Sequence, residues 1–255
     1  MKVRLRGHFA LAGGAVALLA LSALLLASCG DGAVRPDTPP PGVGSEWSTD
    51  FSKHSVPLNE FIGGGPPKDG IPSIDDPQFV SLDEAEKWLD DGEPLALLEA
   101  GGETRLYPIQ ILTWHEIVND EVGGTPVAVT YCPLCNSTVA FERMVDGALL
   151  DFGTTGRLRR SDLVMYDRQT ESWWQQLTAE AVVGEYTGTE LEIVPTGIVS
   201  WGEAKRTYGD ASVLSRDTGF DRDYGNSPYP GYDEPDSQPF LLDEDADDRL
   251  PAKTR

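Results

Sequence analysis

Short alternating runs of apolar and polar residues dominate the chain between residues 95 and 214. The runs 126–131 and 137–143 alternate with a period of two and carry β-branched side chains, which is typical of β-strands. Gly101-Gly102 and Asp146-Gly147 stand between such runs and indicate tight hairpin turns. Further strands are predicted at 95–99, 104–107, 148–152, 163–166, 190–194 and 212–214, and the run 172–177 fits either a strand or a short helix.

Three segments are predicted to be helical. Ser81-Leu82-Asp83-Glu84 and Ser200-Trp201-Gly202-Glu203 are capping boxes, in which the serine and glutamate side chains bond free amides at a helix start. These helices should run to about residue 89 and about residue 208. Pro108 suits the first position of another helix, which should close at Asn119-Asp120. Short strands joined by Gly turns, with two or three helices, predict a single α+β domain with a mainly antiparallel sheet.

The N-terminal segment has the pattern of an export signal. Lys2, Arg4 and Arg6 precede an almost wholly apolar stretch from residue 9 to residue 27. Leu26-Ala27-Ser28-Cys29 then resembles the lipobox of bacterial lipoproteins, where cleavage leaves a lipid-modified cysteine as the first residue. We therefore expect residues 1–28 to be a lipoprotein signal peptide and Cys29 to carry fatty acyl chains such as palmitate. The alternative is an ordinary signal peptide or an uncleaved anchor in which Cys29 is incidental.

The segment after Ser28 is expected to lie outside the folded domain. Residues 29–50 are rich in Gly, Pro and Asp, so they hold few apolar groups to offset the entropy cost of ordering. We expect them to form a disordered tether and the folded domain to span 51–255. Together with the lipid anchor, this places the domain at the cell membrane, on its extracytoplasmic face.

The charge of the chain excludes some partners. It carries 42 acidic and 20 basic residues, a net charge of −22, so no basic surface is expected for nucleic acid or for anionic lipid. The acids are concentrated between residues 233 and 248, without the spacing of a calcium-binding EF-hand loop. This run is interpreted as a solvated tail.

Cys132 and Cys135 are the main candidates for chemistry. In an exported protein this spacing suits a thiol–disulfide redox pair, a soft metal site for zinc or copper, or a structural disulfide. A thioredoxin fold is excluded because the residues after Cys135 alternate like a strand instead of opening a helix. His115 is the expected third ligand, with His54, Met144, Met165 or an acid as the fourth. The alternative for His115 is a half-buried side chain bonded to Glu116 or to a backbone carbonyl.

A second group of residues could line a small-molecule pocket. Arg168 would clamp an anion and Trp173 would offer an aromatic face, as part of a set that comprises Asp162, Asp167, Arg168, Gln169, Trp173, Arg216 and Asp217. The alternative is a hairpin whose tryptophans fill the core and whose arginine pairs with an acid. A serine hydrolase is excluded because the chain has no GxSxG motif and has few histidines.

Several long motifs resemble those of one protein family, domain of unknown function 3179. They are Gly64-Gly65-Pro66-Pro67-Lys68-Asp69-Gly70-Ile71-Pro72, Trp114-His115-Glu116-Ile117-Val118-Asn119-Asp120, Thr130-Tyr131-Cys132-Pro133-Leu134-Cys135, Ser161-Asp162-Leu163-Val164-Met165-Tyr166-Asp167-Arg168-Gln169-Thr170 and Leu214-Ser215-Arg216-Asp217-Thr218-Gly219-Phe220. The resemblance covers about residues 61–254 and implies no particular activity. It implies that Cys132, Cys135 and His115 work together. Members continue beyond the segment that resembles Asp248-Arg249-Leu250-Pro251, so the domain is expected to be C-terminally incomplete.

The sequence thus predicts a lipid-anchored extracytoplasmic protein with a metal or thiol-redox site at Cys132 and Cys135. If His115 belongs to that site, its ring should lie within ligand distance of the two sulfurs. The alternatives are a non-catalytic binding or assembly lipoprotein with a structural disulfide, and an enzyme that acts on a small substrate near Arg168 and Trp173.

Overall fold

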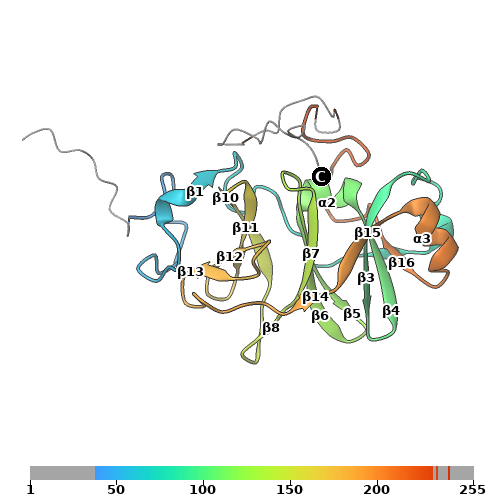
Figure 1. Ribbon diagram of the computed structural model, residues 1–255. Coiled ribbons are helices and arrows are strands. Elements are labelled where there is room, and N and C mark those ends of the chain that lie inside the picture. Colours follow the sequence, from blue (N-terminus) through green and yellow to red (C-terminus); the bar gives the residue numbers. More distant parts are fainter. Residues whose placement is uncertain (1–37, 232–233, 235–240, 242–255) are drawn as a thin grey trace, which may run out of the picture. The chain divides into compact units, whose positions relative to one another are not determined.

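The computed structural model describes residues 38–231, 234 and 241, all of which belong to one compact unit (Figure 1). Antiparallel strands dominate three sheets, and the parallel pair in them joins β4 (Glu103–Pro108) and β16 (Ser212–Leu214). The predicted α+β class with a mainly antiparallel sheet is therefore confirmed. The predicted signal peptide, Cys29 and most of the acidic tail lie outside the described residues.

Sheet A has the strand order β1-β10-β11-β12-β13. Their bounds are β1 (Phe61–Gly63), β10 (Phe152–Arg159), β11 (Asp162–Asp167), β12 (Trp173–Gln175) and β13 (Ala181–Val183). The strand predicted at 148–152 is wrong in its bounds, because the long strand here, β10, begins at Phe152 and runs through the Gly153-Thr154-Thr155-Gly156 stretch. The chain remains paired there, and a register shift between Thr154 and Arg157 absorbs the irregular backbone.

Sheet B is the central sheet, with the order β14-β7-β6-β5. Its strands are β5 (Ile117–Val122), β6 (Thr125–Cys132), β7 (Ser137–Glu142) and β14 (Ile193–Val194), and a small β8 (Met144–Val145) and β9 (Ala148–Leu149) hairpin follows β7. Strand β5 was not predicted, because its residues were assigned to the preceding helix. That helix ends at His115, well before the predicted Asn119-Asp120, because Glu116 takes a left-handed conformation with φ of 58°.

Sheet C has the order β15-β3-β4-β16-β2. Its strands are β2 (Phe79–Val80), β3 (Pro94–Ala100), β4 (Glu103–Pro108), β15 (Thr196–Ser200) and β16 (Ser212–Leu214). The helices are η1 (Leu58–Glu60), α1 (Leu82–Ala85), α2 (Ile109–His115) and α3 (Trp201–Thr207). Ser81 and Ser200 accept hydrogen bonds from the amides of Glu84 and Glu203, so the predicted caps of α1 and α3 are confirmed.

The apolar clusters show how the layers pack. Sheet B is buried on both faces, because Val127, Val129 and Tyr131 of β6 pack toward sheet C while Ala128 and Cys132 pack toward sheet A. The outer face of sheet C is covered by α1 and α3, and Figure 1 shows α3 beside this sheet. The run of buried residues in β6 follows from this central position, since a strand covered on both faces favours apolar side chains on both of its faces.

The outer face of sheet A is covered by the segment that precedes β1. Trp47 is 9% exposed, and its ring lies 5.0 Å from the rings of both Tyr166 and Trp173. Thr49 is also buried and donates a hydrogen bond to the carbonyl of Glu171. The tether expected over residues 29–50 is thus too long at its C-terminal end, because Trp47 packs against Tyr166 and Trp173 of sheet A.

Candidate functional site

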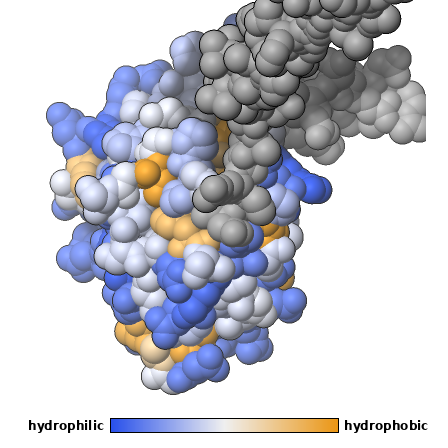
Figure 2. All heavy atoms as spheres, turned by 90° about the vertical axis from the view of Figure 1, so that its left-hand side faces the viewer, coloured by the Kyte–Doolittle hydropathy of each residue, from blue (hydrophilic) through white to orange (hydrophobic). Residues whose placement is uncertain are grey.

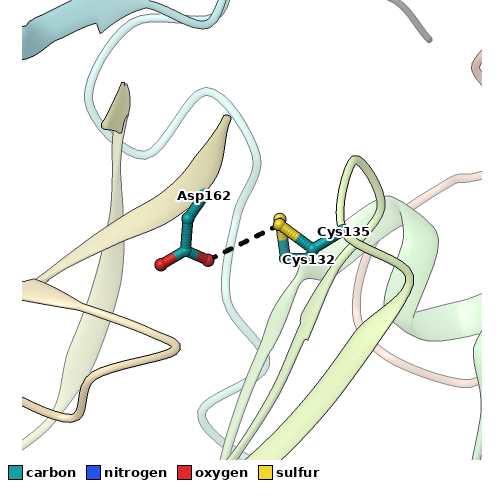
Figure 3. Close-up of side chains that lie close together, drawn as sticks. All are labelled: Cys132, Cys135 and Asp162. Atoms are coloured by element: carbon teal, nitrogen blue, oxygen red, sulfur yellow. Dashed lines mark hydrogen bonds between the residues drawn. The ribbon is translucent and has the colours of Figure 1, made fainter. Parts of the chain in front are cut away.

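The two cysteines lie at the junction of β6 and β7. Cys132 ends β6 and faces sheet A, and Cys135 lies in the turn that leads to β7. Asn136 allows this turn by taking a left-handed conformation with φ of 47°, and its side chain accepts a hydrogen bond from Tyr131 Oη. The two Sγ atoms are 3.3 Å apart, with Cys132 buried and Cys135 half-buried (Figure 3).

Asp162 joins the cysteines from sheet A. The two turn residues before it, Arg160 and Ser161, both have positive φ, which is the backbone of a tight type I′ hairpin. This turn aims the Asp162 carboxylate at the sulfurs, where one oxygen accepts from the Cys135 thiol at 3.8 Å (Figure 3). The other oxygen accepts from the Leu177 amide at 3.1 Å. The ligand atoms of the three side chains all lie within 4.8 Å of one another.

Hydrogen bonding and burial together decide the protonation of this cluster. The hydrogen bond that the Cys132 thiol donates to Cys135 Sγ, together with the loss of solvent, raises the pKa of Cys132 well above its usual value. Burial also raises the pKa of Asp162, against the opposing effect of the Leu177 amide. Charge on these groups is costly unless a cation arrives, so the cluster can hold protons or exchange them for a metal ion.

His115 does not join this cluster. One ring nitrogen lies 2.7 Å from the carbonyl of Pro72 and the other lies 2.6 Å from Tyr224 Oη. Tyr224 packs against the apolar cluster between sheets B and C, whereas Cys132 faces sheet A. The structure therefore places Asp162, and not His115, beside the two thiols. Burial lowers the pKa of His115, which favours the neutral ring between these two partners.

The other ligands expected from the sequence lie elsewhere. His54 Nδ1 is 2.9 Å from the carbonyl of Val56, at a bridge to β13. Met144 is exposed in β8, and Met165 is buried in the apolar cluster that also holds Cys132. Among the described residues, the cysteines and Asp162 form the group of metal-ligating side chains.

The seven residues predicted to share a pocket are distributed over the domain. Trp173 is fully buried in the core, and Arg168 pairs with Asp75 at 2.6 Å. Asp167 is buried and accepts from Trp174 Nε1, while Gln169 bonds Asp151. Asp162 belongs to the cysteine cluster. The remaining two lie on the segment after β16, where Arg216 bonds Gln110 and Asp217 is exposed.

Glu116 is a buried acid whose importance the sequence did not reveal. It is 7% exposed, and burial raises its pKa to about 8. Tyr229 Oη lies 3.4 Å from its carboxylate. Its place beside His115 in a strongly apolar run was the one signal in the sequence that this acid is buried. Its conformation could not be predicted, because it depends on the unexpected end of α2 at His115.

No helix in the described part of the chain is long and apolar enough to cross a membrane.

Comparisons with known proteins define the family. Searches of curated proteins and of solved structures found no match. A family model described as a protein of unknown function, DUF3179, matches residues 68–255, which include the cysteines, Asp162 and His115. Because the match spans well over half of the chain, this protein belongs to the DUF3179 family.

Proposed function

We propose that this protein binds one zinc or copper(I) ion through Cys132, Cys135 and Asp162, outside the cytoplasm and on a lipid anchor. The proposal rests on the convergence of two thiols and one carboxyl group, whose ligand atoms lie within 4.8 Å of one another at a largely buried point. Within residues 38–231, no lysine, arginine or histidine forms an ion pair with Asp162. A buried acidic cluster without a protein cation is the electrostatic arrangement that a metal ion stabilises.

The donor set favours a soft ion. Two thiolates suit zinc or copper(I) better than magnesium or calcium, which prefer oxygen ligands. Three protein ligands would leave one position of a tetrahedral zinc ion for water or for a ligand from another molecule. Because Cys132 and Asp162 must lose protons that burial helps them to retain, metal affinity should fall as the pH is lowered.

A thiol–disulfide exchange role is the second candidate, and the 3.3 Å contact between the sulfurs favours it. Oxidation would join the two sulfurs and pass two electrons and two protons to a partner disulfide, which would become a dithiol. Asp162, next to Cys135, is placed to take one of these protons. However, no basic group stabilises a thiolate here within the described residues, and reactive cysteines usually need one.

The lipid anchor is supported by the apolar N-terminal stretch and by Cys29 at a lipobox-like position. Stable anchoring needs two or more acyl chains, which this class of modification provides. Metabolic labelling with palmitate should mark the full-length protein and should not mark a Cys29→Ser variant. Labelling that persists in Cys29→Ser would rule out this anchor.

Metal content and thiol state test the site directly. The full-length protein is purified in detergent without added metal, beside Cys132→Ser/Cys135→Ser, Asp162→Asn and His115→Gln. Elemental analysis should find one equivalent of zinc or copper in the wild type, none in the double serine variant and weakened retention in Asp162→Asn. His115→Gln serves as the matched control and should keep its metal, because His115 does not contact the cluster.

The same samples separate the alternatives. If no metal is found and both thiols react only after a reductant is added, the pair is a disulfide and the metal proposal fails. Its reduction potential then distinguishes a redox protein from a binding or assembly protein with a structural disulfide. Loss of metal in His115→Gln, with Asp162→Asn unaffected, would show that the ligands are a different set.

A further inference from the structure

A second site lies on the other side of sheet A, away from the cysteines. The segment before β1, the loop before Ile71 and strand β10 enclose a hollow of about 350 Å³, which is within the size range of small-molecule sites. Charged residues of both signs line it, and these are Glu46, Lys68, Asp69 and Arg157. The face that carries β1 and β13 is mainly hydrophilic, with only scattered hydrophobic residues (Figure 2).

Arg157 offers hydrogen-bond donors to a ligand in this hollow. Its guanidinium carries five N–H donors. Within the described part of the chain its side chain makes one hydrogen bond, to the carbonyl of Pro41 at 2.7 Å. The residue is half-buried, so the cation is held against the protein while its other donors remain available. Such a fork matches a carboxylate, which accepts two parallel hydrogen bonds.

The second cation is already neutralised. Lys68 pairs with Glu171 at 2.6 Å, and its ammonium lies between the rings of Trp47 and Tyr166, at 4.2 and 4.7 Å from their centres. The two acids of the hollow, Glu46 and Asp69, oppose further negative charge. Arg157 is thus the cation of the hollow that forms no ion pair within the described residues, although it lies near enough to Glu46 to help lower the pKa of that acid. A single cation of this kind suits a monoanion better than a dianion such as phosphate.

One wall of the hollow, the Pro66-Pro67 turn on β10, is fixed before any ligand arrives. Gly156 has a φ of +68°, and a Cβ there would lie 2.1 Å from the carbonyl oxygen of Pro66. The Pro66-Pro67 turn is thus pressed onto β10 and is stiff by its own chemistry. A preformed site lowers the entropy cost of binding, and the proline rings offer apolar surface to the hydrocarbon part of a ligand.

We propose that this hollow binds a small monocarboxylate, whose carboxylate group is held by Arg157. The site is independent of the cysteine cluster, since the residues that line it come from the opposite face of sheet A. Binding of a carboxylate in the hollow needs no metal at the cysteine cluster, so a negative result at one site does not affect the proposal for the other.

Saturation-transfer NMR with the full-length protein and propionate as the probe tests this site. The variants are Arg157→Met and its matched control Arg160→Met, which removes the same charge from a side chain that is 72% exposed on the neighbouring turn. Propionate should bind the wild type and Arg160→Met equally, and Arg157→Met at least about tenfold more weakly. Inorganic phosphate should compete with propionate less well than acetate does.

A third variant keeps the test decisive if Arg157→Met fails to fold. Glu46 is exposed, and Glu46→Gln removes a negative charge beside the ligand while it keeps an acceptor for the Gly44 amide. It should bind propionate a few-fold more tightly. The proposal is overturned if propionate shows no saturation transfer with the wild type, if Arg157→Met binds as well as Arg160→Met, if phosphate competes best, or if Glu46→Gln does not tighten binding.

Discussion

Replacement of Glu116 by glutamine should stabilise the protein, and the gain should depend on pH. Glu116 follows α2 in a left-handed conformation, and its carboxyl group is buried with Tyr229 Oη at 3.4 Å. Loss of solvent is the main reason that its pKa rises from 4.5 to about 8. Glutamine keeps the shape and an acceptor for the tyrosine, but it cannot ionise.

The magnitude follows from proton linkage. A carboxyl group with a raised pKa holds its proton more tightly in the folded than in the unfolded state, so its stabilising effect is complete below pH 4.5. That effect is lost as the pH rises from 4.5 to about 8. The shift of 3.5 units, from 8 minus 4.5, corresponds to about 5 kcal/mol at about 1.4 kcal/mol per unit. This figure is an upper limit, because the ionised side chain can turn toward water.

Urea unfolding at several pH values between about 5 and 9 measures the effect. The free energy of unfolding of Glu116→Gln, minus that of the wild type, should rise with pH and level off above pH 8. Glu121→Gln makes the same charge change at an exposed position of β5 and should show no such rise. A difference between Glu116→Gln and wild type that stays constant over this range would refute the reasoning.

Two further substitutions test the packing around sheet A, both by urea unfolding. Trp47→Ala should cost about 3–5 kcal/mol, because it removes a buried ring that contacts Trp173, and a cost below about 1 kcal/mol would show that this segment is not bound to the sheet. Gly156→Ala should cost far more than Gly188→Ala. Both glycines have positive φ, but a Cβ meets Pro66 at 2.1 Å in the first case and no atom within 4 Å in the second. Equal costs would contradict the close approach.

The strands could be predicted where the local pattern of apolar and polar residues determines them. They were harder to predict where the packing of one sheet on another determines them. The hairpin of β3 and β4 follows from alternation around Gly101-Gly102, whose φ angles of 54° and 84° fit the tight turn. Strand β5 was missed because Ile117 and Val118 continue the apolar run of α2. Only the left-handed turn at Glu116 separates helix from strand, and glutamate is a residue from which such a turn is not expected.

The site was predicted in part, for a similar reason. The closeness of Cys132 and Cys135 follows from their spacing, but the third member depends on which sheet faces which. Asp162 is 27 residues from Cys135 and reaches it through the packing of sheet A on sheet B. Trp173 and Trp174 illustrate the same limit, since adjacent residues of β12 point into different apolar clusters.

The separation of His115 from the cysteines follows from the central position of β6. A side chain on this strand faces either sheet A or sheet C, and the alternation places Cys132 toward sheet A with Ala128. His115 ends a helix whose residues pack on the other face, and its partner Tyr224 comes from the segment beyond β16. Nearness along the chain therefore does not bring the two groups together, because the sheet lies between them. By the same geometry, Glu116→Gln and Cys132→Ser/Cys135→Ser should change stability and metal content independently, and their combination should show additive effects.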